Sequence, residues 1–188
     1  MGQADLLKAV VTALEESSVR YLVTGSMASS LLGEPRPSHD LDLVVHLPEG
    51  AAARLGERFG PPTYHLDVAA AEEARKAGTM FNLLDVQEGD KVDFWMLTGE
   101  PFDRSRMARR IRISSLGMSL WLSSPEDTIL AKLSWARKSG GSERQLRDAL
   151  GVYEVQRRKL DEAYLGEWAG QLGVTDLWFD LKSQARAS

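Results

Sequence analysis

The sequence predicts a mixed α/β (α+β) fold, in which a mixed β-sheet flanked by helices is followed by a C-terminal helical bundle. Short β-prone segments alternate with segments of helical periodicity up to about residue 122, and Gly or Pro closes most of them. After residue 123 the periodicity is helical alone. The 188 residues are 43% apolar and 27% charged, an ordinary globular composition. We therefore expect an α/β region in residues 1–123 and a helical region packed on it in residues 124–188.

The first elements follow from apolar spacing and from the turn residues. Residues 6–14 carry Leu and Val at helical spacing, which predicts an amphipathic helix. Residues 21–24 are β-prone and stop at Gly25, and residues 26–32 are small and apolar, which favours a short helix. The next segment, residues 33–37, holds two prolines one residue apart and is predicted to be a loop.

The middle of the chain is predicted to supply most of the sheet. The turn residues 87–90 between two apolar segments favour a β-hairpin. The predicted strands are residues 40–45, 81–86, 91–97, 110–113 and 118–122, and the predicted helices between them are residues 51–59 and 69–77.

The last third of the chain is predicted to be helical. Ser124 is a preferred N-cap residue, Pro125 suits the first helical position and acidic residues follow, so a helix is predicted from there to about residue 138. Further helices are predicted at residues 142–158, 161–171 and 175–185. Four tryptophans are expected to pack in the core or between helices: Trp121, Trp135, Trp168 and Trp178.

Composition excludes several kinds of site. The chain has no Cys, which rules out disulfides, thiolate metal sites and a Cys nucleophile. No apolar run is long enough to span a membrane and the N-terminus does not resemble a signal peptide, so we expect a cytoplasmic protein with no membrane partner. The formal net charge of −4 argues against a general nucleic-acid binder.

The charge is unevenly distributed. Residues 1–100 contain 8 Lys and Arg against 16 Asp and Glu, whereas residues 101–188 contain 15 against 11, and five Arg lie within residues 104–112. This split is compatible with an acidic site that holds a cation and a basic wall that faces an anion. The alternative is solvated surface charge without a function.

Three acidic residues are the candidates for such a cation site. Asp40 and Asp42 alternate along one predicted strand, so both carboxylates point to one face, where a hard divalent cation would neutralise them. Asp93 is flanked by bulky apolar residues in another strand, a costly position unless a charge partner lies near. The alternatives are a solvent-facing strand for the pair and an edge strand for Asp93.

Gly25 and Ser26 end one strand and open a short helix. Glycine lets a ligand approach the backbone closely, and the free N–H groups at a helix start favour a phosphate. A simple turn is the alternative.

The order of these features resembles the signature of a known superfamily. GSMA at residues 25–28, RPSHDLDL at residues 36–43 and VDF at residues 92–94 resemble the polymerase-β-type nucleotidyltransferases. Within that superfamily, the likeness is to small bacterial enzymes of the abortive-infection toxin kind. SPEDTILAKL at residues 124–133 and RQLRD at residues 144–148 extend the likeness, which covers about residues 20–150.

The resemblance implies a nucleotidyltransferase fold and a Mg²⁺-dependent enzyme that moves a nucleoside monophosphate from a nucleoside triphosphate to a hydroxyl. The acceptor would be a tRNA, a protein or a small molecule, and the protein would be the toxin of a toxin–antitoxin pair. Asp40, Asp42 and Asp93 would hold Mg²⁺, and Asp93 would accept the proton of the nucleophile. One alternative is a non-catalytic nucleotide-binding module or toxin–antitoxin component with this fold, and another is a structural domain with acidic surface residues.

The resemblance also implies a set of nucleotide-binding residues, namely Gly25, Ser26, Arg36, Ser38, Lys132 and Asp148. Arg36 would contact substrate or orient Asp40, unless it is an exposed loop residue. Lys132 would lie near the phosphates, whereas its place on an apolar helical stripe is equally compatible with covering apolar surface. Asp148 would pair with Lys132, or with Arg144 one helical turn before it.

Overall fold

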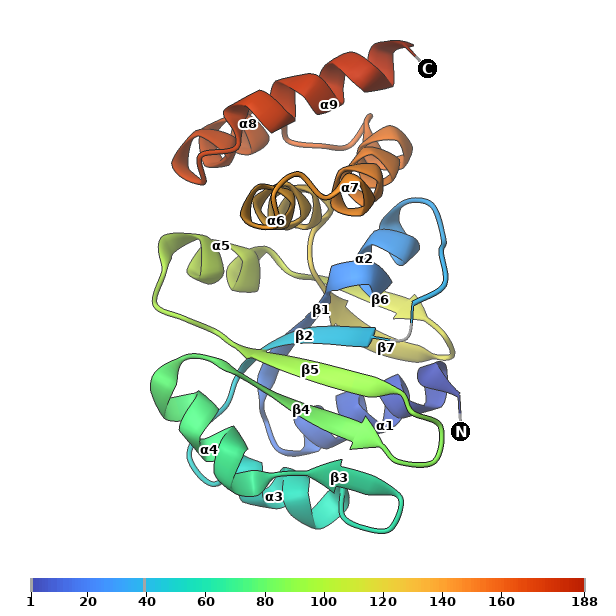
Figure 1. The fold of residues 1–188 in the computed structure, drawn as a ribbon, viewed down its shortest axis with the longest axis vertical. Coiled ribbons are helices and arrows are strands. Elements are labelled where there is room, and N and C mark those ends of the chain that lie inside the picture. Colours follow the sequence, from blue (N-terminus) through green and yellow to red (C-terminus); the bar gives the residue numbers. More distant parts are fainter. Residues whose placement is uncertain (1, 39, 188) are drawn as a thin grey trace. The chain divides into compact units, whose positions relative to one another are not determined.

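The computed structural model describes residues 2–38 and 40–187, and its strands form one seven-stranded sheet (Figure 1). The strands are β1 (Arg20–Thr24), β2 (Asp40–His46), β3 (Tyr64–Leu66), β4 (Met80–Asp85), β5 (Lys91–Met96), β6 (Ile111–Ser115) and β7 (Met118–Leu122). The helices are α1 (Gln3–Glu16), α2 (Gly25–Leu32), α3 (Ala51–Arg58), α4 (Val68–Ala77), α5 (Pro101–Arg109), α6 (Pro125–Lys138), α7 (Glu143–Gln156), α8 (Glu162–Gln171) and α9 (Thr175–Ala187).

The sheet is mixed. Its strand order is β3-β4-β5-β2-β1-β7-β6. The pairs β2–β5 and β1–β7 are parallel, and the other neighbours are antiparallel. The predicted mixed sheet with flanking helices and a helical C-terminal part is therefore confirmed, and so is the hairpin between β4 and β5.

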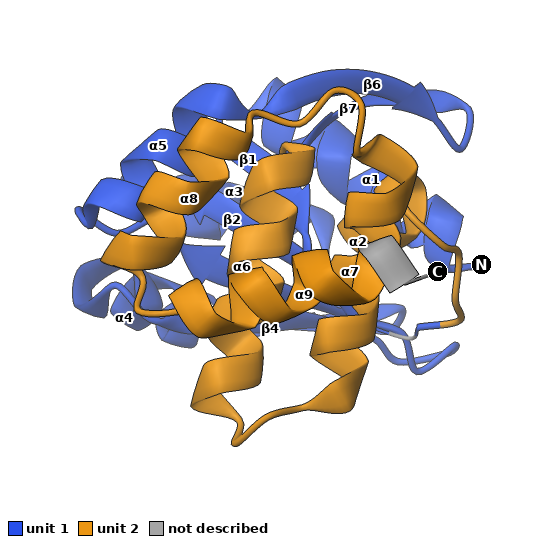
Figure 2. Ribbon diagram, turned by 90° about the horizontal axis from the view of Figure 1, so that it is seen from above, with its two compact units in different colours: residues 1–24, 38–122 blue, residues 25–37, 123–188 orange. Residues whose placement is uncertain are grey.

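The chain divides into two compact units (Figure 2). The first contains Met1–Thr24 and Ser38–Leu122, and the second contains Gly25–Pro37 and Ser123–Ser188. Every strand of the described sheet belongs to the first unit, whereas α2 belongs to the second together with α6, α7, α8 and α9. The sequence alone places residues 25–37 in its first region, and the division at residue 123 stays a prediction.

The two faces of the sheet differ in the first unit. Leu41, Leu43 and Val45 of β2 point to one face and are fully buried together with the alternating apolar residues of β5. Contacts of α1 with β1 and α3, and of α4 with β4 and α3, show which helices pack on the sheet. On the other face Val44 packs with Leu22 and with Met107 of α5. Burial of these side chains supplies the main stabilisation of the unit.

The second unit is a helical bundle. Helix α6 begins at the predicted N-cap, where the Ser124 side chain accepts a hydrogen bond from the Asp127 amide. The Asp127 carboxylate is fully buried and accepts hydrogen bonds from the hydroxyls of Ser124 (2.8 Å) and Tyr164 (2.6 Å). These contacts tie the start of α6 to α8 and satisfy a charge that would otherwise be costly to bury.

Gly33 lets the end of α2 approach α7 closely. A Cβ atom at Gly33 would lie 2.6 Å from the Val152 amide nitrogen and 2.7 Å from the Gly151 carbonyl carbon. Both are backbone atoms of a helix and cannot move aside alone. The residue after α2 must therefore be glycine for this packing to form.

Substituting Gly33→Ala is expected to lower the free energy of unfolding by about 1–3 kcal/mol, because the added methyl group pushes α2 from α7. The matched control is Gly166→Ala in α8, where a Cβ would meet nothing within 4 Å. That change is expected to be neutral or stabilising, since Ala favours a helix. Chemical denaturation measures both, and equal stabilities of the two variants would contradict the packing argument.

Some elements differ from the predictions. Strand β3, which is only three residues long, and helix α5 are not among the predicted elements. Trp178 is 2% exposed, as expected for a core residue, whereas Trp135 is 48% exposed and does not lie in the core. Trp135 lies on α6, where the Lys138 ammonium nitrogen lies 5.8 Å from the centre of its ring. In residues 2–38 and 40–187 we find no helix with the length and apolar character needed to cross a membrane.

The predicted basic wall is largely paired within the first unit. Its arginines lie on α5 and at the start of β6. Arg106 pairs with Asp103 at 2.7 Å, Arg112 pairs with Glu15 at 3.1 Å, and Arg110 lies over the Trp121 ring at 4.5 Å. Arg104 donates a hydrogen bond to the Gly99 carbonyl. These contacts favour a structural role for much of this charge.

Candidate active site

Two of the predicted catalytic acids lie side by side on neighbouring strands. The parallel register of β2 and β5 pairs the Cα atoms of Asp42 and Asp93, and Asp40 lies two residues before Asp42. Side chains alternate along a strand, so all three carboxylates emerge on one face of the sheet. Asp93 is 7% exposed, and its Oδ1 atom is buried without a hydrogen-bond partner.

Lys91 lies between these carboxylates. Its Cα atom pairs with that of Asp40, and its Nζ atom is 2.9 Å from Oδ2 of Asp93 and 3.8 Å from Oδ1 of Asp40. The hydrogen bond with Asp93 raises the pKa of Lys91 above its ordinary value, against a lowering by burial, and the charges of Asp40 and Asp42 raise it further. Lys91 is the charge partner that the buried Asp93 requires.

Other contacts fix the start of β2. The indole nitrogen of Trp95 donates a hydrogen bond of 3.2 Å to Oδ1 of Asp42. Ser38 precedes the strand, and its hydroxyl donates to the Asp40 carbonyl at 3.4 Å while its own carbonyl accepts from the Gln3 side chain at 2.8 Å. His39, which we expect on the opposite sheet face from the acids, lies outside the described residues.

The donor set on this face fits a divalent metal ion. Within the described part of the chain no three acidic or histidine side chains are arranged to hold one ion by themselves. Mg²⁺ usually takes only one or two carboxylates and completes its shell with water and substrate phosphates. The paired Asp42 and Asp93 match that requirement, and the unsatisfied Oδ1 of Asp93 is an oxygen that a cation would satisfy.

The predicted phosphate-binding residues belong to the second unit. Gly25 has a φ of +65°, in the left-handed region that favours glycine, and it is the first residue of α2. Ser26 follows and is 6% exposed, and its carbonyl accepts a hydrogen bond of 3.0 Å from the Ser29 hydroxyl. The predicted short helix directly after the glycine is confirmed.

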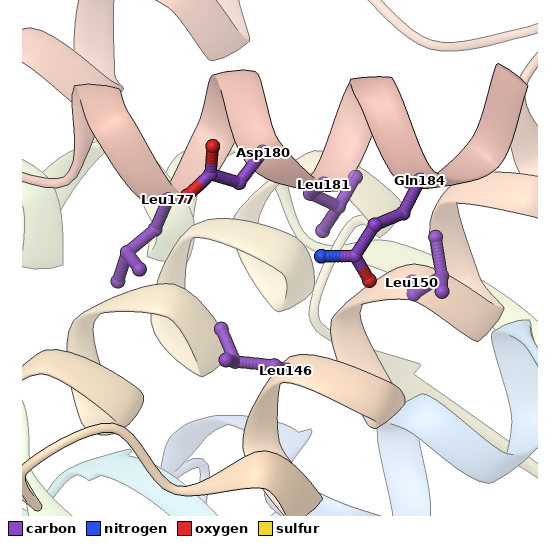
Figure 3. A pocket seen from close by; sticks show the side chains of 6 residues that line it. All are labelled: Leu146, Leu150, Leu177, Asp180, Leu181 and Gln184. Carbon is purple, nitrogen blue, oxygen red and sulfur yellow. The ribbon is translucent and has the colours of Figure 1, made fainter. Parts of the chain in front are cut away.

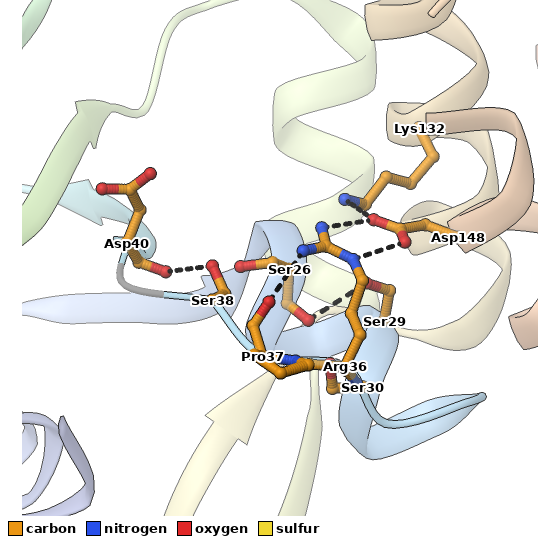
Figure 4. Close-up of polar contacts among 9 residues, drawn as sticks. All are labelled: Ser26, Ser29, Ser30, Arg36, Pro37, Ser38, Asp40, Lys132 and Asp148. Carbon is orange, nitrogen blue, oxygen red and sulfur yellow. Dashed lines mark hydrogen bonds and ion pairs between the residues drawn. The ribbon is translucent and has the colours of Figure 1, made fainter. Parts of the chain in front are cut away.

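Three more predicted residues form one ion-pair cluster in the second unit (Figure 4). The Arg36 guanidinium donates two hydrogen bonds to the Asp148 carboxylate, of 2.7 and 2.8 Å. The Lys132 ammonium group lies 2.7 Å from Oδ2 of the same carboxylate. The side chains of Asp148 and Lys132 are 5% and 6% exposed, and that of Arg36 is 24% exposed. Lys132 is therefore buried beside an anion and does not merely cover apolar surface.

Two cations face one carboxylate in this cluster, so the three side chains together carry a net charge of +1. Burial raises the pKa of Asp148, but the hydrogen bonds and charges of Arg36 and Lys132 outweigh burial and hold that pKa below its ordinary value. The hydrogen bond to Asp148 raises the pKa of Arg36. The carboxylate therefore stays ionised, and it anchors the loop before β2 to α6 and α7.

A small pocket in the second unit is separate from all of these residues. It has a volume of about 60 Å³ and lies between α7 and α9 (Figure 3). Its lining consists of Leu146, Leu150, Leu177, Asp180, Leu181 and Gln184. Ligand pockets for nucleotide-sized molecules occupy about 300–1,000 Å³, so this cavity is too small for a nucleotide.

The sheet face that carries Asp40, Asp42 and Asp93, here called the acidic face, also carries Lys91 and Trp95, which are not among the predicted site residues. Both alternate with Asp93 along β5, and that alternation is a signal from which they could have been found. The double hydrogen bond between Arg36 and Asp148 joins residues 112 positions apart, and no local pattern predicts it.

A solved structure shares this architecture. No family model matches the chain, and no curated protein matches its sequence. The chain is similar to an antigenic nucleotidyltransferase-like protein from Paracoccidioides brasiliensis, with a TM-score of 0.60 and 16% identity over 98% of this chain and 92% of that one. It also aligns with ANT(2'')-Ia in complex with adenylyl-2''-tobramycin (TM-score 0.49, 13% identity, 98% of this chain and 97% of that one) and with JHP933 from Helicobacter pylori (TM-score 0.40, 17% identity, 100% and 97%). The first likeness confirms the predicted nucleotidyltransferase fold.

Proposed function

We propose that this protein is a nucleotidyltransferase that uses a divalent metal ion to transfer a nucleoside monophosphate to a hydroxyl group. We propose Mg²⁺ as this ion because it prefers oxygen ligands such as carboxylates. The observation that carries the proposal is the pairing of Asp42 with Asp93 on one face of the sheet, with Asp40 beside them. The buried, unsatisfied Oδ1 atom of Asp93 supports a cation at this position. The nucleotidyltransferase fold supports the same class of reaction.

The proposed reaction joins the acceptor oxygen to the α-phosphorus of a nucleoside triphosphate. The bond from that phosphorus to the bridging oxygen breaks, and pyrophosphate leaves. A bound divalent ion supplies electrostatic stabilisation of the attacking and leaving oxygens. Asp40 and Asp42 would hold the ion, and Asp93 would bind it and take the proton of the acceptor hydroxyl.

All the predicted nucleotide-binding residues except Ser38 belong to the second unit, and their roles remain predictions. Gly25 and Ser26 would bind the terminal phosphates through backbone N–H groups and the Ser26 hydroxyl. Arg36 and Lys132 would contribute the positive charge that Asp148 does not neutralise, and Asp148 would hold both in position. Ser38 would contact the nucleotide at the start of β2.

The experiment incubates the protein with each labelled nucleoside triphosphate, with and without Mg²⁺. It measures transfer of the labelled nucleoside monophosphate to cellular RNA, to cellular protein and to a pool of small hydroxyl compounds. We expect Mg²⁺-dependent labelling of one fraction together with release of pyrophosphate. The fraction that becomes labelled identifies the acceptor class, and growth arrest on expression of the chain would test the toxin role. Absence of both labelling and pyrophosphate release with all nucleotides would contradict the proposal.

A second candidate is a non-catalytic nucleotide-binding module with the same fold. It is favoured by the ion pair of Asp93 with Lys91, because a paired carboxylate is less available to hold a catalytic metal ion or to take a proton. Calorimetry separates the two candidates, because a module would bind a nucleoside triphosphate without releasing pyrophosphate.

A further inference from the structure

Lys91 has no role in the proposed reaction, yet it lies among the residues that would perform it. It emerges from β5 on the same face as Asp93, and its ammonium nitrogen is 2.9 Å from Oδ2 of Asp93 and 3.8 Å from Oδ1 of Asp40. Both carboxylates are proposed ligands of the divalent ion. A positive charge of the chain itself therefore occupies a place on the acidic face.

We propose that Lys91 is a built-in competitor of the divalent ion, and that its ammonium group must leave Asp93 before the ion can use that carboxylate fully. This inference rests on the proposed function. One oxygen of Asp93 is engaged by Lys91 and the other is buried without a partner. A divalent ion bound to Asp93 would face the ammonium charge at close range, and two cations repel each other strongly at such a distance.

The side chain of Lys91 is the part that can move. It is 34% exposed and has a flexible four-carbon stem, whereas the Asp93 side chain is 10% exposed and sits within the sheet. Lys91 can turn its ammonium group toward solvent without disturbing β5. Release of Lys91 therefore requires no change in the backbone.

The same contact protects the chain when no metal ion is bound. Three carboxylates on one face repel each other, and Lys91 offsets part of that repulsion. The metal-free protein is thereby stabilised, while its affinity for a free divalent ion is reduced.

The test measures the affinity for Mn²⁺ by electron paramagnetic resonance. The wild-type chain is compared with Lys91→Met and Lys91→Arg. Lys91→Met is expected to bind Mn²⁺ about three- to tenfold more tightly, because a partly exposed ion pair is lost, whereas Lys91→Arg keeps the wild-type affinity. Lys76→Met on α4 removes one exposed positive charge away from the acids and is the matched control. Mn²⁺ should also raise the melting temperature of Lys91→Met more than that of the wild type, and metal-free Lys91→Met should melt at a lower temperature.

Equal Mn²⁺ affinity in Lys91→Met and Lys76→Met would overturn the inference and leave the proposed function standing. Absence of Mn²⁺ binding in the wild type and in Lys91→Met alike would overturn the metal site of the proposed function and the inference with it. Lys91→Gln, which keeps a polar side chain, is measured in the same way if Lys91→Met does not fold.

Discussion

Replacing Asp42 with Asn is expected to lower the rate of nucleotidyl transfer by about 10³-fold, because loss of a metal-binding carboxylate removes several kcal/mol of transition-state stabilisation. Asn has nearly the same volume, and its side-chain oxygen can still accept the hydrogen bond that Trp95 donates to Asp42 at 3.2 Å. The sheet should therefore persist while the negative charge opposite Asp93 is lost. Turnover of labelled nucleoside triphosphate measures the rate, and circular dichroism reports the fold.

Glu73→Gln is the control for Asp42→Asn. Glu73 is exposed on α4, and the substitution removes the same charge from the first unit without touching the acidic face. We expect it to retain the wild-type rate. If Asp42→Asn remained as active as Glu73→Gln, the acidic face would not be the reaction centre.

Replacing Asp148 with Asn is expected to lower the free energy of unfolding by about 3–5 kcal/mol, as for other buried ion pairs that lose one partner. Asp148 accepts two hydrogen bonds from Arg36 and one from Lys132, and the Lys132 side chain is only 6% exposed. Asn removes the carboxylate that the buried Lys132 ammonium group faces. Urea denaturation measures the loss.

The double variant Asp148→Leu with Lys132→Met separates the ion pair from packing. It removes both buried charges and keeps apolar volume at each position, and such replacements are often neutral in other proteins. Arg36 is 24% exposed and can turn toward water. We expect the double variant to recover most of the stability lost in Asp148→Asn. A double variant as unstable as the single one would show that the charges are not the cause.

The lowered pKa of Asp148 predicts that the stability of the fold depends on pH. Since the pKa of Asp148 is below its ordinary value in the folded protein, ionised Asp148 stabilises the fold above the ordinary pKa of about 4. That contribution is lost as the pH falls from about 4 through the lower pKa of the folded state. The difference in stability between the wild type and Asp148→Asn should therefore shrink below about pH 4.

The features that the sequence predicts well are those that depend on residues close together in the chain. The alternation of Asp40 and Asp42 along β2, the N-cap at Ser124 and the glycine at the start of α2 each depend on neighbours within a few residues. The pairing of Asp42 with Asp93 depends on strand order, which the sequence does not show. Its prediction came from resemblance to a known family.

The missed features have separate physical causes. Helix α5 buries only Asp103 and Met107 among its side chains, so it lacks the apolar stripe from which helices are recognised. Strand β3 is too short for a clear alternation. Arg36 resembles an exposed loop residue in sequence because its partner, Asp148, is supplied by α7 much later in the chain.

The membership of α2 in the second unit has a consequence for synthesis of the chain on the ribosome. Residues 25–37 emerge early, but α6 and α7, which they contact, begin at Pro125 and Glu143. At roughly 5–20 residues per second, this segment waits several seconds for its partners. A fragment that stops near residue 122 would carry α2 without the helices α6 and α7 that it contacts in the full chain.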